Sequence, residues 1–206
     1  ATYGLIDKKG RLLEPVYHYR DRRTEHTLED MYRVISRRKL FELTGCQCAR
    51  TYTLPQLYSC VLSKDPCLGS AEKLLLLPDL LSYFLTGIKT TEMTIAGTSG
   101  LLDKTQKEWS FEITKMFSIP SHLLTEIVMP GTVKGNISSK IAAETNLGNV
   151  RLAATISHDS AAAVASIPGF GPGKLYISIG TNVSMGIERD EPLISDATFV
   201  AGFKNT

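Results

Sequence analysis

The first third of the chain carries two different apolar periods. Apolar residues occur at 3–7 and 11–13, on either side of a turn that contains Gly10, which predicts a β-hairpin. After an extended stretch at 16–20, apolar residues recur at i, i+3, i+4 and i+7, the spacing of an amphipathic helix. The residues with this spacing are Leu28, Met31, Tyr32 and Ile35.

Start and stop residues predict further helices in the middle of the chain. A helical pattern at 40–43 stops at Gly45, and another at 54–62 has Pro55 in its first turn. Residues 74–77 are wholly apolar and fit either a buried strand or the approach to a helix. Three later helices have predicted N-caps, which are Asp79 before 80–85, Ser110 before 111–117 and Ser138 before 139–145.

The last quarter of the chain combines strand signals with small residues. Residues 150–156 predict a strand, and the alanine-rich run 160–166 predicts a helix that can approach a sheet closely. A Pro/Gly loop at 168–173 is the best candidate for a domain boundary. Residues 175–179 and 183–187 predict a strand pair joined by the tight turn Gly180-Thr181-Asn182.

Composition and charge fit an ordinary globular protein. The 206 residues are 43% hydrophobic and 21% charged, which predicts one domain or two small ones. The formal net charge is only +2, whereas a protein that follows nucleic-acid phosphates is normally more basic, so we expect no such partner. The apolar run 74–78 is too short to span a bilayer, and no secretory leader opens the chain, so we expect no membrane partner and a cytoplasmic location.

The four cysteines predict reduced structural thiols. A chain of this length builds a core without disulfides. The spacing between Cys46 and Cys48, with no histidine nearby, does not match the usual zinc patterns. We therefore expect no metal ligands here, and a redox or metal role for these two with Cys60 and Cys67 is the alternative.

Asp159 is the first candidate for chemistry. It follows a strand of buried type and precedes a helix, a place where α/β folds meet their ligands. A carboxylate there can accept a proton from a bound hydroxyl; the alternative is a simple helix cap. His158 beside it can hydrogen-bond a polyol or be a structural histidine. A Ser-His-Asp triad over 157–159 is excluded, because consecutive strand residues point to opposite faces.

Gly180 and Thr181 form the second candidate site. A glycine in a hairpin turn lets backbone N–H groups approach a phosphate, and the threonine adds a hydroxyl donor. An ordinary hairpin turn is the alternative. The segment 171–174 ends in Gly-Lys, but a strand follows it, so it is not a phosphate-binding P-loop.

The third candidate is a cluster of aromatic and charged residues at 17–24. Its alternating side chains, Arg20 and Asp21 among them, could line a polar ligand pocket. Alternatively, Arg20 or Arg23 pairs with Asp21 or Glu25 on a solvated face.

Taken together, the motifs resemble the FGGY family of carbohydrate kinases, over essentially the whole chain. The specific segments are the S-H-D and S-x-G-T motifs, here Ser157-His158-Asp159 and Ser178-Ile179-Gly180-Thr181. The other matching segments are Leu5-Ile6-Asp7-Lys8-Lys9-Gly10, His18-Tyr19-Arg20-Asp21-Arg22-Arg23-Thr24, Leu75-Leu76-Leu77-Pro78-Asp79 and Pro130-Gly131-Thr132-Val133-Lys134-Gly135.

The resemblance implies a fold and a function. The fold would be α/β, of the actin-like, ribonuclease-H-like ATPase type, with a sugar-binding domain over 1–170 and the start of an ATP-binding domain over 171–206. The intact protein would use ATP and Mg²⁺ to phosphorylate a ketose, L-rhamnulose or a similar sugar. Asp159 would be the catalytic base, His158, Ser160, Arg20 and Asp21 would contact the sugar, and Gly180 and Thr181 would contact the ATP phosphates.

The chain also departs from the family pattern. It has no D-x-G-x-x-S-x-R phosphate hairpin, and it begins and stops without the usual signals of a natural boundary. We therefore expect a fragment that is inactive alone and that self-associates through its cut edges. The usual T-N-A-S/T is replaced by Thr94-Ile95-Ala96-Gly97-Thr98, and Asn182 stands where a tryptophan is usual. These departures keep open a degenerate, non-catalytic module that binds a sugar or a partner chain.

Overall fold

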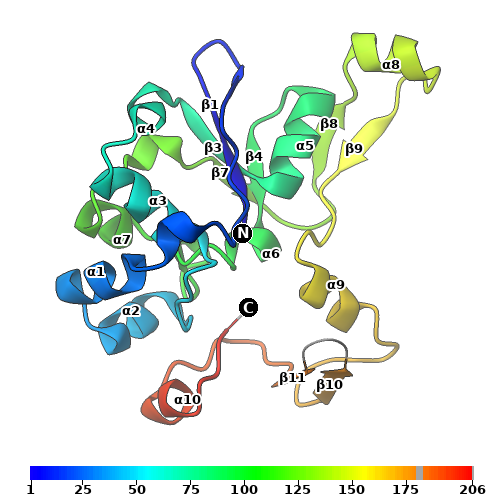
Figure 1. Cartoon of the computed structure of the whole chain (residues 1–206). Coiled ribbons are helices and arrows are strands. Elements are labelled where there is room, and N and C mark those ends of the chain that lie inside the picture. The colour runs from blue at the N-terminus through cyan, green and yellow to red at the C-terminus, as the bar shows by residue number, and fades with distance from the viewer. Residues whose placement is uncertain (180–182, 206) are drawn as a thin grey trace.

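A three-stranded antiparallel sheet lies at the centre of the packed part of the chain (Figure 1). The computed structural model describes residues 1–179 and 183–205. The sheet has the order β2–β1–β3, with β1 at Tyr3–Ile6, β2 at Leu12–Leu13 and β3 at Lys73–Leu76. β1 is buried along its whole length and pairs with both neighbours. The predicted hairpin is confirmed, and the apolar run at 74–77 is a strand as far as Leu76.

Short strand pairs continue the β-structure beyond this sheet. β4 (Thr90–Glu92) runs parallel to β7 (Glu126–Val128). The antiparallel pairs are β5 (Leu102–Asp103) with β6 (Glu108–Trp109), and β8 (Val133–Asn136) with β9 (Arg151–Ala153). The strand predicted at 150–156 is therefore only three residues long, and the stretch at 16–20 forms no strand.

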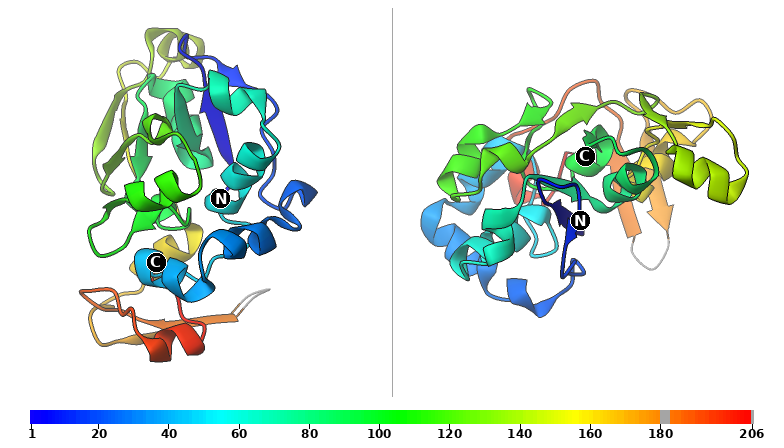
Figure 2. Two further views of the ribbon diagram at one scale, coloured as in Figure 1. Left: turned by 90° about the vertical axis from the view of Figure 1, so that its left-hand side faces the viewer. Right: turned by 90° about the horizontal axis from the view of Figure 1, so that it is seen from above.

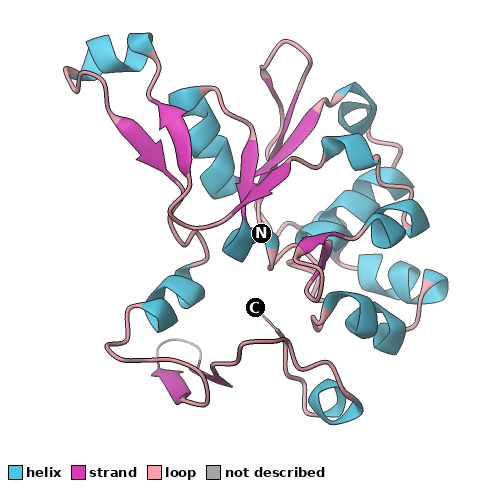
Figure 3. Cartoon of the chain, turned by 180° about the vertical axis from the view of Figure 1, so that it is seen from behind, coloured by secondary structure: helices cyan, strands magenta, loops and turns pink. Residues whose placement is uncertain are grey.

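Most helices gather on one side of the central sheet, on the left of Figure 1 and the right of Figure 3. Local residues set their ends as predicted. Gly45 ends α2 in the left-handed conformation with φ 65°, and the Ser110 side chain accepts a hydrogen bond from the Ile113 N–H at the start of α7. These elements are η1 (Arg22–Thr24), α1 (Thr27–Val34), α2 (Arg37–Thr44), α3 (Thr53–Leu62), α4 (Pro66–Ser70), α7 (Phe111–Met116) and η2 (Ser121–Leu123).

The main hydrophobic core lies between these helices and the sheet. Tyr58 of α3 packs edge-on against Phe117, with 4.9 Å between ring centroids. Fully buried side chains from many elements complete it, among them Met31, Leu40, Leu54, Leu57, Leu76, Ile113 and Leu123. No helix in the described part of the chain has the length and apolar character needed to cross a membrane.

Asp79 corrects one prediction from the sequence. It does not cap a helix, because α5 (Leu77–Thr86) begins two residues earlier, with Leu76 at its N-cap. The Asp79 carboxylate is buried and pairs with the ammonium of Lys134 of β8 at 2.7 Å. It also accepts a hydrogen bond from the Glu92 N–H at 3.1 Å. Burial outweighs these partners and raises the pKa of the Asp79 carboxyl.

The C-terminal region, residues 139–179 and 183–205, has secondary structure but few buried residues. Figure 2 shows its ribbon from two further sides. Its elements are α8 (Ser139–Thr145), α9 (Asp159–Ala165), β10 (Leu175–Ile179), β11 (Val183–Ile187) and α10 (Asp196–Val200), besides β9. The predicted Ser138 cap and the antiparallel strand pair are confirmed. Phe199 attaches this region to α2, with its ring 5.4 Å from that of Phe41 and its carbonyl accepting from the Gln47 amide at 3.0 Å.

Candidate functional site

Asp159 is the first residue of α9 and projects into solvent. Its side chain is 97% exposed. One carboxylate oxygen, Oδ1, accepts from the Ser160 N–H at 2.7 Å and from the Ser160 hydroxyl at 3.4 Å. The N-cap position belongs to His158, so Asp159 is not the simple cap of the alternative prediction. Its second carboxylate oxygen has no hydrogen bond to any described residue and is available to a bound hydroxyl.

His158 lies beside this carboxylate, half-enclosed by the protein. Its side chain is 18% exposed, and its Nε2 is 3.7 Å from Asp159 Oδ1. Burial lowers the pKa of the imidazole, and the neighbouring Asp159 only partly offsets this. Nδ1 is buried and has no hydrogen-bond partner among the described residues. A neutral imidazole next to an exposed carboxylate can both accept and donate hydrogen bonds to a polyol.

A buried carboxylate and a hydroxyl hold the backbone just before Asp159. The Ser157 N–H donates to Glu92 Oε2 and to Thr94 Oγ1, both at 3.1 Å, and the His158 N–H donates to Thr94 Oγ1 at 3.2 Å. Glu92 ends β4 and caps the short helix α6 (Met93–Ala96). From the sequence, residues 94–98 stand out only as a motif departure, and this role is missed. No familiar cap signal marks it, because Glu is not among the preferred N-cap residues.

Arg20 and Asp21 lie on a different element. The Asp21 carboxylate caps η1 by accepting from the Arg23 N–H at 2.9 Å. Arg20 is exposed, with its guanidinium 5.3 Å from the Tyr19 ring centroid. Within residues 1–179 and 183–205, no hydrogen bond or ion pair joins these two side chains to 157–160. His158, Asp159 and Ser160 therefore contact one another, and the role of Arg20 and Asp21 as sugar contacts stays a prediction.

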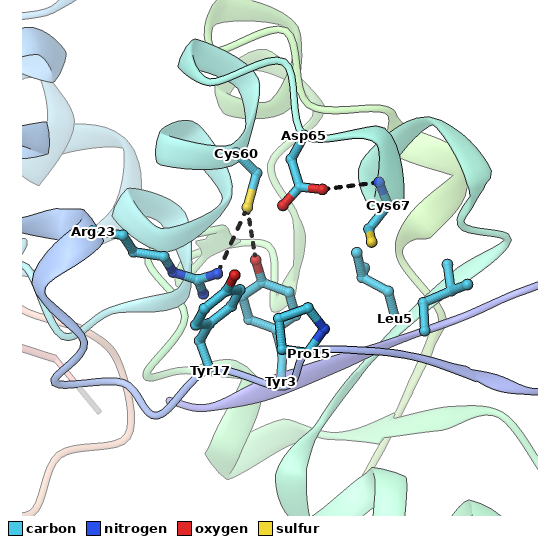
Figure 4. A pocket seen from close by; sticks show the side chains of 9 residues that line it. Tyr3, Leu5, Pro15, Tyr17, Arg23, Cys60, Asp65 and Cys67 are labelled. Atoms are coloured by element: carbon cyan, nitrogen blue, oxygen red, sulfur yellow. Dashed lines mark hydrogen bonds between the residues drawn. The ribbon is translucent and has the colours of Figure 1, made fainter.

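Arg23 turns inward, contrary to the predicted solvated ion pair. Its guanidinium lies 4.0 Å from the Tyr17 ring centroid (Figure 4). It also donates to Gln56 Oε1 at 3.3 Å. Asp65, Cys60 and Cys67 line the same pocket, whose free volume is about 20 Å³. That volume corresponds to about one water molecule. A sugar does not fit there, so this pocket is a structural feature of the N-terminal region.

The remaining candidates are the phosphate turn and the cysteines. Gly180 and Thr181 lie outside the described residues. All four cysteines are free thiols, and burial raises the pKa of Cys48 to about 12. The part of the chain that the structure describes contains no group of three or more potential metal ligands among its His, Cys, Asp and Glu side chains.

Comparison with known proteins gives consistent matches. The family model for the N-terminal domain of FGGY carbohydrate kinases matches residues 1–165. Over the full length of this chain, it is 35% identical to a rhamnulokinase of Enterococcus faecalis and 34% identical to one of Bacteroides thetaiotaomicron. It spans only 41% and 42% of those relatives.

Solved structures agree on the fold. A ligand-bound xylulose kinase from Lactobacillus acidophilus superimposes with a TM-score of 0.81, at 18% identity, over 95% of this chain and 40% of that one. A glycerol kinase from Plasmodium falciparum with ADP superimposes with a TM-score of 0.77, at 20% identity, over 89% of this chain and 37% of that one. The predicted actin-like α/β fold, present in part, is confirmed.

Proposed function

Because this chain belongs to the FGGY family of carbohydrate kinases, we propose that the whole protein transfers a phosphoryl group from ATP to a ketose. The acceptor we propose is L-rhamnulose or a similar sugar, because rhamnulokinases align with the chain from end to end. In this proposal residues 1–170 belong to the sugar-binding domain and residues 171–206 begin the ATP-binding domain. The use of ATP is consistent with a cytoplasmic location.

The carboxylate of Asp159 is the proposed general base. The observation that carries this is its 97% exposure directly beside a half-enclosed histidine. A general base needs an oxygen within hydrogen-bond reach of the proton that it removes, and this carboxylate has one free. Asp159 accepts the proton of the sugar hydroxyl while the hydroxyl oxygen forms a bond to the γ-phosphorus of ATP, whose bond to the bridging oxygen breaks so that ADP leaves. The residues beside Asp159 are proposed to bind and orient the sugar.

His158 and Ser160 are the proposed sugar contacts closest to the base. Both are sequence neighbours of Asp159, and their side chains lie within 3.7 Å of its carboxylate. The buried environment keeps the imidazole neutral, so it orients a hydroxyl without introducing a second charge. Arg20 and Asp21 are proposed contacts from the segment just before η1, and Asp21 would act there in addition to capping that turn.

ATP phosphates would contact Gly180 and Thr181, between β10 and β11. When bound, ATP supplies the phosphoryl group. The described residues contain no group of three or more His, Cys, Asp and Glu side chains that could hold a metal ion, and Mg²⁺ in phosphoryl-transfer sites is held largely by substrate phosphates and waters. The Mg²⁺ of the proposal is therefore assigned to no residue here, and the activity is a property of the whole protein, not of this chain alone.

The test is sugar-dependent ADP release by the whole protein, with L-rhamnulose, a xylulose, glycerol and gluconate as acceptors. Asp159→Asn should lower kcat by a factor of about 10² to 10⁴, the usual contribution of a general base. Asp190→Asn, at an exposed position in the same region, is the matched control and should leave kcat unchanged. Turnover of Asp159→Asn within tenfold of wild type would overturn the base assignment. Sugar binding without turnover by the wild type would instead favour the non-catalytic module.

A further inference from the structure

Glu92 and Thr94 hold the segment that carries Asp159, and we propose that they are positioning residues for catalysis. The proposal rests on the proposed function, in which Asp159 is the base. The two side chains lie at the end of β4 and the start of α6, more than 60 residues before the segment that they hold. They act on its backbone and not on the sugar.

Asp159 depends on its own backbone for its place in space. Among the described residues, its carboxylate makes hydrogen bonds or ion pairs only with its neighbours, Ser160 and His158. Between 155 and 160, the only hydrogen bonds to distant described residues are those of the Ser157 and His158 N–H groups. All three end on Glu92 or Thr94. A shift of these two side chains would therefore move the carboxylate itself.

The Thr94 hydroxyl is fully used in this arrangement. It donates to Glu92 Oε2 at 2.6 Å and accepts from the Ser157 and His158 N–H groups at 3.1 and 3.2 Å. A hydroxyl has one hydrogen to donate and two lone pairs that accept, so no capacity is left. Removal of the hydroxyl leaves the His158 N–H without its partner. Serine would preserve all three bonds.

The Glu92 side chain is fully buried, and its carboxylate accepts hydrogen bonds from N–H and O–H groups. Oε1 accepts from the Thr94 N–H at 2.8 Å. Oε2 accepts from the Thr94 hydroxyl, the Ile95 N–H at 3.2 Å and the Ser157 N–H at 3.1 Å. Four donors around one carboxylate match an ionised group, which has acceptors only. A glutamine would direct an NH₂ group at one of these donors.

The support continues one step further into the protein. The Glu92 N–H donates to Asp79 Oδ1, and the same oxygen receives the Lys134 ammonium. The side chains of Asp79 and Lys134 are 1% and 2% exposed. A polar chain thus runs from Lys134 through Asp79, Glu92 and Thr94 to the segment of Asp159. Its first three members are buried and Thr94 is partly buried, so the segment is attached to groups that the N-terminal region holds in place.

A base must be held to within a fraction of an ångström, and a displacement of about 1 Å costs about 10²-fold in rate. In the whole protein, Thr94→Val should therefore lower kcat by about 10- to 100-fold. Thr94→Ser keeps the hydroxyl and should stay within threefold of wild type. A Thr94→Val enzyme with wild-type kcat, or a Thr94→Ser enzyme that loses as much as Thr94→Val, would overturn the proposal.

Amide hydrogen exchange separates this proposal from the proposed function. In the wild-type whole protein the amides of Ser157 and His158 should exchange slowly, and the His158 amide should exchange at least tenfold faster in Thr94→Val but not in Thr94→Ser. Unprotected amides in the wild type would refute the proposal even if no variant folds. If the wild type lacks kinase activity while these amides behave as expected, the catalytic assignment fails and the positioning contact remains. With an active wild type, unchanged exchange in Thr94→Val refutes the positioning contact alone.

Discussion

The N-terminal region, residues 1–136, and the C-terminal region, residues 139–205, contain equally regular secondary structure but differ in burial. Every residue of β1 is buried, whereas the helices and strands of the C-terminal region contain no buried residue. The β10–β11 ladder is nevertheless the longest in the described chain, with five paired positions. Backbone pairing and caps therefore form without a core, but a two-stranded ribbon alone is at best marginally stable.

The β10–β11 pair also presents an apolar face. Alternate residues on the two strands lie opposite one another and are between 50% and 81% exposed. They are Leu175, Ile177, Ile179, Val183, Met185 and Ile187. A face of this kind is usually covered in a finished domain. The chain spans about two fifths of its rhamnulokinase relatives, so we infer that further chain covers this face in the whole protein. Self-association of the present chain through this face stays a prediction.

The largest effect should come from the buried ion pair of the N-terminal region. Lys134→Met leaves the Asp79 carboxylate enclosed without its counter-ion and beside Glu92, and should cost about 3–5 kcal/mol of unfolding free energy. Lys140→Met replaces an exposed lysine of α8 and should cost less than about 0.5 kcal/mol. Urea unfolding of the two variants measures the difference. Similar costs for both would mean that the contrast in burial does not translate into stability.

Two leucines, one in each region, test the same difference in burial with uncharged side chains. Leu54 of α3 is fully buried, so Leu54→Ala should cost about 2–5 kcal/mol. Leu175 of β10 is 61% exposed, and Leu175→Ala in this chain should cost under about 0.5 kcal/mol. In the whole protein Leu175→Ala should cost clearly more, because the apolar face is then covered. An unchanged cost there, measured by the same denaturant titration, would contradict that inference.

The sequence predicts the elements whose determinants are local. The hairpin at Gly10, the C-terminal end of α2 at Gly45 and the start of α7 at Ser110 depend on residues within one turn of each other, and all three are found as predicted. Cap and turn residues act through the nearest backbone groups, so their signal is contained in a short window of sequence. Local patterns do not predict how these elements are arranged in space. The actin-like α/β fold was predicted from the resemblance to a family.

The misjudged residues all depend on distant partners. Asp79 looks like a cap but pairs with a lysine 55 residues away, and Arg23 looks solvated but bonds a glutamine 33 residues away. The Glu92 contact to Ser157 spans 65 residues. Burial of a polar side chain requires such a partner, and periodicity carries no information about which one it is. For the candidate site, the sequence therefore identified the residue that projects and missed the residues that hold it.

The smallest effect concerns the pH dependence contributed by His158, at the start of the C-terminal region. Burial lowers the pKa of its imidazole below the ordinary value of 6.5. As the pH falls below 6.5, the unfolded chain binds a proton that the folded chain does not. Stability from this group is therefore fully present above pH 6.5 and is lost as the pH falls toward the folded-state pKa. Its contribution to the slope cannot exceed about 1.4 kcal/mol per pH unit, the limit for one proton.

His158→Gln should remove this slope, and His26→Gln is the matched control because the His26 side chain is 80% exposed. The free energy of unfolding of both variants and the wild type is measured by urea titration between pH 5 and pH 8. A wild-type slope that persists in His158→Gln would assign the titration to another group. A slope that disappears would show that the imidazole beside Asp159 is held neutral by enclosure even where the surrounding region has almost no core.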